Sequence, residues 1–431
     1  MRAPLGAPVA IFGGGVSGAG IGVLLAATGA AGAVYDAKGT EFTAAAALRH
    51  KLVVFSPGFA PDHPWLKRAA AAGCVCLAEI DFAALFWRGK IVAVTGTNGK
   101  TSLTEFLAQA LNGSGREAHA AGNIGMPLSR LAAEKAGGAA EATAVCEVSS
   151  FQAEALRHFR ADATLWTNFA EDHLERHSGL EAYFSAKWEL VRRTPADRFF
   201  AGSSVQRAAE QFGRTLPGPA RVATEGQPED PFLEGSPFAA YPQRENFILA
   251  AAWWKAEGLE QAELYAAASR FRLGRHRLAR VGEVAGIVFW NDSKATNFHA
   301  VEAALARFHS PVQWIAGGKS KGGDVAAFVR RIAPRIRRAY LIGETKAVLS
   351  AACAAAGVPC TECATLEDAV GRAAGDAAGA GHVLLSPGFA SFDMFRSYED
   401  RGDRFEQAVR SLGLRFSPST DRIPSFSHTF P

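Results

Sequence analysis

The sequence has few of the features that would indicate a disulfide scaffold, a zinc site or a nucleic-acid partner. Only six cysteines occur among 431 residues, and only Cys360 and Cys363 form a C-x-x-C pair, whereas a structural zinc site usually takes two such pairs. The net charge is only +4, and no dense block of Lys and Arg with interleaved aromatic residues occurs. We therefore favour reduced, buried thiols over a zinc site, and expect no nucleic-acid partner.

Charge is also missing from the N-terminal region, where no charged residue stands between Arg2 and Asp36. A stretch of this length could form a membrane helix or a signal peptide. Many glycines interrupt it, however, and divide it into a strand, a glycine turn, a helix and a second strand, and buried βαβ units are equally apolar. We expect no membrane insertion and a cytoplasmic location.

Apolar runs of strand length alternate with Ala-rich helical stretches along most of the chain, which predicts an α/β fold with parallel sheets. We predict three domains. A Rossmann-like domain spans 1–88, a central P-loop ATPase-like domain spans 89–274, and a second Rossmann-like α/β domain spans 275–431. The Pro/Gly-rich segment 214–243 predicts loops or short strands, and the Ser/Pro-rich tail after Phe416 predicts irregular structure.

The clearest motif lies in residues 92–111, VAVTGTNGKTSLTEFLAQAL, where a strand, a glycine turn and a helix together form a site for a polyphosphate. Val94 occupies the position of the first glycine in the generic P-loop pattern, which is therefore not met. The physical arrangement still suits phosphate, because backbone N–H groups at a helix start and a lysine both attract anions. The predicted nucleotide contacts from this turn are Gly96, Thr97, Asn98, Gly99, Lys100, Thr101 and Ser102.

Three further side chains give this turn a catalytic context. Glu147 ends an apolar strand, His173 lies in a polar loop just past another strand, and Lys187 lies in a helical stretch. Each is ordinary alone, since a single histidine usually satisfies local hydrogen bonds and a single helical lysine is usually solvated. Their order along the chain and their placement after strands favour one site around the glycine turn.

Together these motifs resemble the Mur ligase family of peptidoglycan synthesis, the ATP-dependent enzymes that join amino acids to UDP-muramoyl precursors. The resemblance covers nearly the whole chain and rests on TGTNGKT, AGNIG with Asn123, CEVSSFQ, the DH of His173 and the SAK of Lys187. In the last third, NDSKATN and SPGFASFDMF…YEDRGDRF resemble the members that add D-glutamate. The resemblance implies an enzyme that joins UDP-N-acetylmuramoyl-L-alanine and D-glutamate through an acyl phosphate, with ATP as the phosphate donor, and that acts as a monomer.

The resemblance also implies two Mg²⁺ ions, which would let an anionic carboxylate approach the triphosphate. One would be held by Thr101 and Glu147, the other by His173 and Lys187. A lysine ammonium cannot bind a metal. In most of the family the equivalent lysine carries a CO₂-derived carbamate, so the resemblance implies one on Lys187, and its formation requires a neutral amine.

Further roles carried over from the family concern the nucleotide and the catalytic centre. Asn246 would lie beside the adenine, Arg277 would clamp the γ-phosphate, Asp292 would bind the ribose and Lys294 the phosphates or the substrate. The expected catalytic residues are Lys100, His173, Lys187, Arg277 and Lys294.

The two other substrates each have an expected set of contacts. Gly15, Val16 and Ser17 would receive the diphosphate of the UDP precursor, while Asp36, Ser56 and Gly58 would bracket its uridine. Asn123 and Ser149 complete the expected contacts with the precursor. The contacts expected for D-glutamate are Thr296, Lys321, Ser391, Phe392 and Tyr398.

Several alternatives remain open. The pattern Gly13-x-Gly15-x-x-Gly18 followed by Asp36 is also typical of a dinucleotide site, which would indicate an NAD-dependent oxidoreductase. Another Mur-type ligase or a folylpolyglutamate-type ligase would use the same central motifs. The family's Gly-x-His-Asn reads Ala-Tyr-Pro-Gln at 240–243, and its Asn-Ala-Asp-Asp reads Gly-Ser-Ser-Val at 202–205, so a non-catalytic nucleotide-binding relative is a further alternative.

Overall fold

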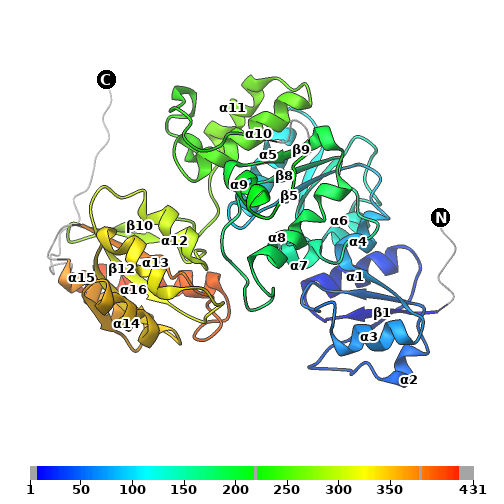
Figure 1. Cartoon of the computed structure of the whole chain (residues 1–431), viewed down its shortest axis with the longest axis horizontal. Coiled ribbons are helices and arrows are strands. Elements are labelled where there is room, and N and C mark those ends of the chain that lie inside the picture. The colour runs from blue at the N-terminus through cyan, green and yellow to red at the C-terminus, as the bar shows by residue number, and fades with distance from the viewer. Residues whose placement is uncertain (1–6, 218–220, 378–380, 417–431) are drawn as a thin grey trace, which may run out of the picture. The chain divides into compact units, whose positions relative to one another are not determined.

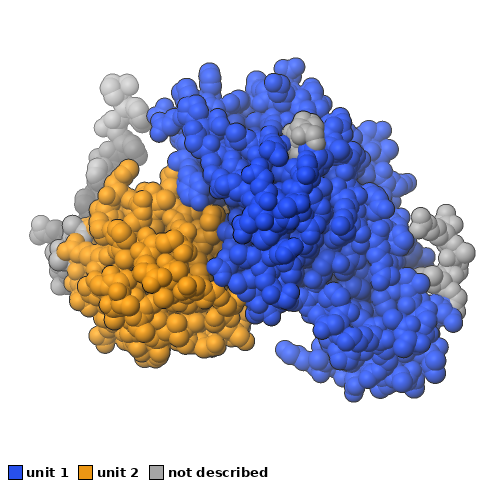
Figure 2. All heavy atoms as spheres, in the orientation of Figure 1, with its two compact units in different colours: residues 1–273 blue, residues 274–431 orange. Residues whose placement is uncertain are grey.

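A computed structural model describes residues 7–217, 221–377 and 381–416 (Figure 1), so the predicted irregular tail after Phe416 lies outside the described residues. The chain divides into two compact units, which we call unit 1 (1–273) and unit 2 (274–431) (Figure 2). Unit 1 contains a four-stranded and a five-stranded sheet, and unit 2 contains a six-stranded sheet. The α/β prediction is confirmed. Within the described ranges, no helix is both long and apolar enough to cross a membrane.

The first sheet of unit 1 is parallel and has the strand order β2-β1-β3-β4. The uncharged N-terminal stretch forms a strand, a turn, a helix and a second strand, as its glycine punctuation predicts. Gly18 is required there, because a Cβ at this position would lie 1.8 Å from the carbonyl oxygen of Gly13. The elements are β1 (Val9–Phe12), α1 (Val16–Ala27), β2 (Gly32–Tyr35), α2 (Ala44–Ala47), β3 (Leu52–Phe55), α3 (Pro64–Ala71), β4 (Val75–Ala78) and α4 (Glu79–Ala84).

The second sheet of unit 1 is also parallel, with the order β6-β7-β5-β8-β9. Its strands are β5 (Lys90–Thr95), β6 (Ala118–Gly122), β7 (Thr143–Glu147), β8 (Ala163–Trp166) and β9 (Phe199–Ala201). Its helices are α5 (Lys100–Gly113), α6 (Leu128–Glu134), α7 (Ser150–Ala153), α8 (Leu180–Trp188), α9 (Ser203–Gln211), α10 (Gln243–Ala256) and α11 (Gln261–Arg270). The described part of segment 214–243 consists of loops, two short 3₁₀ turns and one isolated bridge, as predicted.

The two sheets of unit 1 share a hydrophobic core, in which Ile11 and Ile21 pack in one cluster with Ile91 of the central sheet. Buried carboxylates on α4 reinforce this junction. Glu79 accepts a hydrogen bond from the Ser129 N–H (2.8 Å), and one oxygen of Asp81 accepts three, from the N–H groups of residues 157–159 (2.7–2.9 Å). The structure thus groups the first two predicted domains in one unit, and their division at residue 88 stays a prediction.

Unit 2 has the strand order β10-β11-β15-β12-β13-β14, in which only the edge strand β10 is antiparallel. Its strands are β10 (Ala279–Val284), β11 (Ile287–Asn291), β12 (Val312–Gly317), β13 (Ile336–Ile342), β14 (Cys360–Glu362) and β15 (Gly381–Leu385). Its helices are α12 (Phe298–Leu305), α13 (Val325–Ile332), α14 (Lys346–Ala355), α15 (Leu366–Asp376) and α16 (Tyr398–Phe416). All six cysteines of the chain are free thiols, and four of them are buried.

Candidate active site

The predicted catalytic residues of unit 1 come together because they follow neighbouring parallel strands. β5 leads into the glycine turn, β7 ends at Glu147, and β8 leads into the loop that carries His173. The carboxyl ends of parallel strands lie at one edge of a sheet, where α/β proteins bind their ligands. Figure 1 shows α7 and α8 near this part of the sheet.

The glycine turn packs closely against α10. Gly99 adopts a left-handed conformation (φ 81°) at the start of α5, and a Cβ there would lie 2.7 Å from the side-chain nitrogen of Asn246. This contact requires glycine at 99 and places the predicted adenine-side residue against the turn. Lys100 curls back over the turn, and its Nζ donates to the carbonyl oxygens of Gly96 (3.0 Å) and Thr97 (2.8 Å).

Glu147 links two other predicted residues, Thr101 and Asn123. Its buried carboxylate accepts a hydrogen bond from the Thr101 hydroxyl (2.7 Å) and another from the Asn123 amide (3.2 Å). Ser149, in contrast, is occupied as the N-cap of α7, where it exchanges hydrogen bonds with Gln152. The predicted substrate contact at Ser149 stays a prediction.

Lys187 is buried at the same edge of the sheet, with 1% of its surface exposed. Its Nζ donates to the Gly96 carbonyl (2.9 Å) and the Thr95 hydroxyl (3.3 Å), so Lys187 and Lys100 share one acceptor. Burial, followed by the nearby Lys100 charge, lowers the pKa of Lys187 well below its usual value, although Asp172 and Glu147 act in the opposite direction. Burial thus shifts the equilibrium of Lys187 toward the neutral amine relative to a solvated lysine.

His173 lies on the same side of the sheet as Lys187. The Tyr183 ring contacts both, with Lys187 Nζ 5.0 Å and the His173 ring 6.3 Å from its centroid. His173 has a left-handed backbone (φ 56°), and its N–H donates to the Asp172 carboxylate (2.9 Å). Its Nδ1 lies 3.3 Å from Glu175 Oε1.

Several residues of this site could not be identified from the sequence. Asp172 is buried beside Lys187, and the Tyr183 hydroxyl lies 3.3 Å from the Thr97 hydroxyl. Asn168 holds the glycine turn through both its backbone and its side chain. Asp172 is adjacent to the predicted His173, but nothing in the local pattern marks Tyr183 or Asn168 as parts of the site.

The two segments that depart from the family pattern both anchor parts of the site. In the Gly-Ser-Ser-Val segment, the Ser204 hydroxyl accepts from the Phe169 N–H (3.1 Å) and so anchors the loop that carries His173. In the Ala-Tyr-Pro-Gln segment, Gln243 Oε1 accepts from the Asn246 side chain (2.9 Å), which orients Asn246 against Gly99.

The predicted contacts with the UDP end of the precursor lie at the carboxyl edge of the first sheet. Gly15 is the N-cap of α1, so Val16 and Ser17 begin a helix whose N-terminus suits a diphosphate. The Asp36 carboxylate accepts from the N–H groups of Gly14 (2.7 Å) and Lys38 (3.0 Å), which lower its pKa. Ser56 and Gly58 follow β3 at the same edge.

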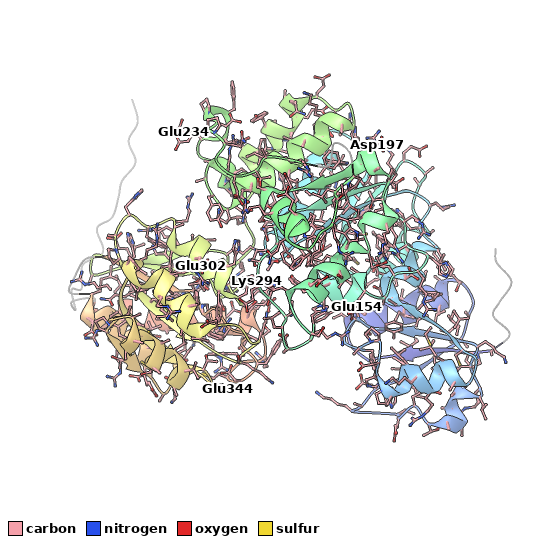
Figure 3. All side chains as sticks on the ribbon, viewed as in Figure 1. Glu154, Asp197, Glu234, Lys294, Glu302 and Glu344 are labelled. Carbon is pink, nitrogen blue, oxygen red and sulfur yellow. The ribbon has the colours of Figure 1, made fainter. Side chains whose placement is uncertain are left out.

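In unit 2 the predicted residues follow the adjacent strands β11, β15 and β12, except Arg277, which precedes β10. Lys294, labelled in Figure 3, lies with its Nζ 3.9 Å from the centroid of the Tyr398 ring, and Lys321 Nζ donates to the Thr296 hydroxyl (3.3 Å). The Arg277 charge acts on the buried Asp292, which also accepts from the Ser386 hydroxyl (2.9 Å). Ser391 is buried in the loop after β15, whereas Phe392 is 70% exposed.

Arg401 joins the loop that follows β11 to the loop that follows β15. This fully buried guanidinium donates to the hydroxyl (3.0 Å) and carbonyl (2.8 Å) of Ser293 and to the Phe389 carbonyl (3.2 Å). We expect Arg401→Met to lower the free energy of unfolding by about 3 kcal/mol, because it leaves buried acceptors without donors. Arg404→Met, an exposed arginine on the same helix, is the control for thermal unfolding; equal losses would contradict this role.

We expect Asp292 to make the stability of unit 2 depend on pH. Burial raises its pKa to about 7, against hydrogen bonds from Ser386 and Leu278 that lower it. Between about pH 4 and 7 the folded carboxyl thus holds a proton that the unfolded chain releases, so its contribution to the free energy of unfolding falls as pH rises. In urea unfolding at several pH values, the free energy of unfolding of the wild-type protein should fall by at most about 1.4 kcal/mol per pH unit because of Asp292. The Asp292→Asn protein should lack this fall. If the difference in free energy of unfolding between the two proteins did not change with pH, this role of Asp292 would be refuted.

The known proteins that the chain resembles are peptide-forming ligases. Residues 94–216 match the model of the Mur ligase middle domain, and residues 276–388 match that of the Mur ligase, glutamate ligase domain. A protein of Trichlorobacter lovleyi is 35% identical over 393 residues, covering 86% of each chain. A protein of Frankia casuarinae is 37% identical over 450 aligned positions, covering 94% of each. Both are named UDP-N-acetylmuramoylalanine–D-glutamate ligase.

Solved structures share the fold at low sequence identity. A pseudomurein peptide ligase type C from Methanothermus fervidus matches with a TM-score of 0.60 and 13% identity, covering 94% of this chain and 100% of that one. The MurF ligase of Thermotoga maritima in complex with ADP matches with a TM-score of 0.56 and 16% identity, covering 85% of this chain and 96% of that one.

Proposed function

The chain belongs to the Mur ligase family, and on this premise we propose that it joins D-glutamate to UDP-N-acetylmuramoyl-L-alanine in an ATP-dependent reaction of peptidoglycan precursor synthesis. The names of its relatives supply the substrates. The observation that carries the chemistry is the gathering of Thr101, Glu147 and Lys187 around one glycine turn. The NAD-dependent oxidoreductase is not supported, since the matched models are ligase domains.

The reaction must bring together a substrate carboxylate and a triphosphate. A carboxylate has no leaving group, so it first attacks the γ-phosphorus of ATP and ADP leaves. The amine of D-glutamate then attacks the carbonyl carbon of the resulting acyl phosphate, and inorganic phosphate leaves. Two like unit charges about 4 Å apart repel by roughly 4 kcal/mol at an effective dielectric of about 20, so cations must lie between the reacting groups. Lys100 and the amides at the start of α5 supply part of this positive potential.

The residues around the turn fit Mg²⁺. The Thr101 hydroxyl and the Glu147 carboxylate are hard oxygen donors 2.7 Å apart, and together with phosphate oxygens they form a typical magnesium ligand set. Within the described residues, no three His, Cys, Asp or Glu side chains form a metal-binding group, so further ligands must come from substrate, water or a modified side chain. Bound Mg²⁺ would neutralise charge that develops on the phosphate oxygens.

The second ion requires modification of Lys187. We propose that its buried amine reacts with CO₂ to form a carbamate, which replaces a cation by an oxygen ligand beside His173. The lowered pKa of Lys187 supports this step, because only the neutral amine is nucleophilic.

The remaining contacts are proposed from the family. The edge of the first sheet, with Gly15–Ser17 and Asp36, would hold the UDP end of the precursor. In unit 2, Thr296 and Lys321 lie close enough to share one carboxylate of D-glutamate. Arg277, Asp292 and Lys294 would act on the nucleotide. A cytoplasmic location, a monomeric state and the absence of a nucleic-acid partner also stay predictions.

The direct test of the activity is ADP formation by the purified protein. We expect turnover only when UDP-N-acetylmuramoyl-L-alanine, D-glutamate, ATP and Mg²⁺ are all present. Parallel assays offer L-alanine with a UDP-muramoyl acid, or glutamate with a folate. Turnover with one of these pairs alone would identify another ligase of the family. No turnover with any pair would refute the proposed ligase activity.

A further inference from the structure

A polar network joins the glycine turn to the loop that follows β8. The Asn98 N–H donates to Asn168 Oδ1 (2.9 Å), and Asn168 Nδ2 donates back to the Asn98 carbonyl (3.0 Å). The Thr97 N–H donates to the Asn168 carbonyl (3.0 Å). One asparagine thus binds two consecutive residues of the turn, in the manner of a short stretch of β-ladder.

Neighbouring residues extend the network on both sides of Asn168. The Thr167 hydroxyl donates to the Asn98 carbonyl (2.7 Å), and the Thr97 hydroxyl both donates to the Ala170 carbonyl (3.1 Å) and accepts from its N–H (3.0 Å). Gly96 packs so closely on this loop that a Cβ would lie 1.9 Å from the Thr167 hydroxyl. All these bonds join protein groups, so a ligand is not needed to make them.

The network changes which backbone groups can bind a polyphosphate. The sequence predicts that N–H groups from Thr97 to Ser102 face the phosphates, but those of Thr97 and Asn98 donate to Asn168. The N–H groups of Gly99, Thr101 and Ser102 lie at the start of α5, where a helix leaves its first amides without intrahelical acceptors and its dipole adds to their attraction for anions. Thr97 and Asn98 thus hold the later part of the turn in position.

We propose that Asn168 is a positioning residue for the nucleotide: it fixes Thr97 and Asn98 so that the amides of Gly99, Thr101 and Ser102 are held in place for the polyphosphate. The proposal rests on the proposed ATP-dependent function and deepens it. Because the same loop continues to His173, Asn168 also connects the glycine turn to the part of the site that contains His173.

Nucleotide affinity tests this role. We expect Asn168→Ala to weaken ADP–Mg²⁺ binding, measured by calorimetry, about tenfold, and to raise the KM for ATP more than it lowers kcat. Binding of the UDP precursor should not change. Asn168→Asp keeps the acceptor for the Asn98 N–H and loses the donor, so we expect its ADP affinity to fall between those of wild type and Asn168→Ala at matched Mg²⁺.

Gln206→Ala is the matched control. The Gln206 side chain also donates to two backbone carbonyls in unit 1, those of Ala201 (3.0 Å) and Val222 (2.9 Å), and these bonds tie α9 to β9 and the loop beyond it rather than to the glycine turn. Both alanine variants should lose similar thermal stability, whereas only Asn168→Ala should lose ADP affinity. Equal ADP affinities in the two variants would overturn the proposal.

Hydrogen exchange on the wild-type protein gives a second test, which does not depend on the folding of a variant. We expect the amides of Thr97 and Asn98 to be protected to the same extent with and without ADP, and those of Gly99, Thr101 and Ser102 to gain protection when ADP binds. Fast exchange at Thr97 and Asn98 before ADP is added would refute the inference. Neither test uses D-glutamate, so a failure of the proposed ligase reaction would be seen separately.

Discussion

Lys187→Ala is expected to reduce ligase turnover by about a hundred- to a thousandfold, because it removes the group that carries the proposed carbamate. Short carboxylic acids such as formate or acetate should restore part of the lost activity, since they can supply a carboxylate in the space that the side chain leaves. ADP formation at saturating substrates measures both effects.

Lys255→Ala, an exposed lysine on α10, is the control for this substitution, and it should keep full activity with no response to acetate. A Lys187→Ala protein that is fully active, or that no small acid rescues, would contradict the carbamate. Isotopically labelled bicarbonate provides a spectroscopic check, because the carbamate carbon should give a carbonyl signal that Lys187→Ala lacks.

Glu147→Gln should lower turnover about a hundredfold and raise the Mg²⁺ concentration needed for half-maximal activity. The amide has nearly the shape of the carboxylate and can still accept from the Thr101 hydroxyl, so the fold of the turn is kept while the charge is removed. A titration of activity against Mg²⁺ measures the change.

Glu141→Gln, at an exposed position just before β7, serves as the control and should leave the Mg²⁺ dependence unchanged. If Glu147→Gln lowered activity without moving the Mg²⁺ requirement, Glu147 would have a structural role, and the metal assignment at Thr101 and Glu147 would be wrong.

Much of the fold could be predicted because its signals are local. Apolar runs such as that ending at Glu147 are too short for helices and are followed by turn residues, which identifies buried strands. In a parallel sheet, the positions of the strand ends also indicate where the site lies, and for this reason Thr101, Glu147 and His173 could be grouped from the sequence. Lys187 lies on a helix, and the resemblance to the family placed it with them.

The rest depends on tertiary contacts that local patterns do not contain. Nothing around Asn168 indicates that its amide would pair with Asn98, because the two residues belong to different strand ends. The same holds for Arg401, whose partners in the Ser293 and Phe389 loops are distant in sequence. The grouping of the first two predicted domains in unit 1 follows from a shared core and the buried carboxylates of α4, not from composition.

Isotope transfer tests the central claim, activation of an acid by phosphorylation, most directly. UDP-N-acetylmuramoyl-L-alanine labelled with heavy oxygen in its carboxylate would be converted with ATP and D-glutamate, and the released phosphate analysed by mass spectrometry. Transfer of one heavy oxygen from the carboxylate to each phosphate is the predicted result, because the acyl phosphate breaks at its carbonyl carbon. Phosphate without the label, from a reaction that still forms the amide, would contradict the account.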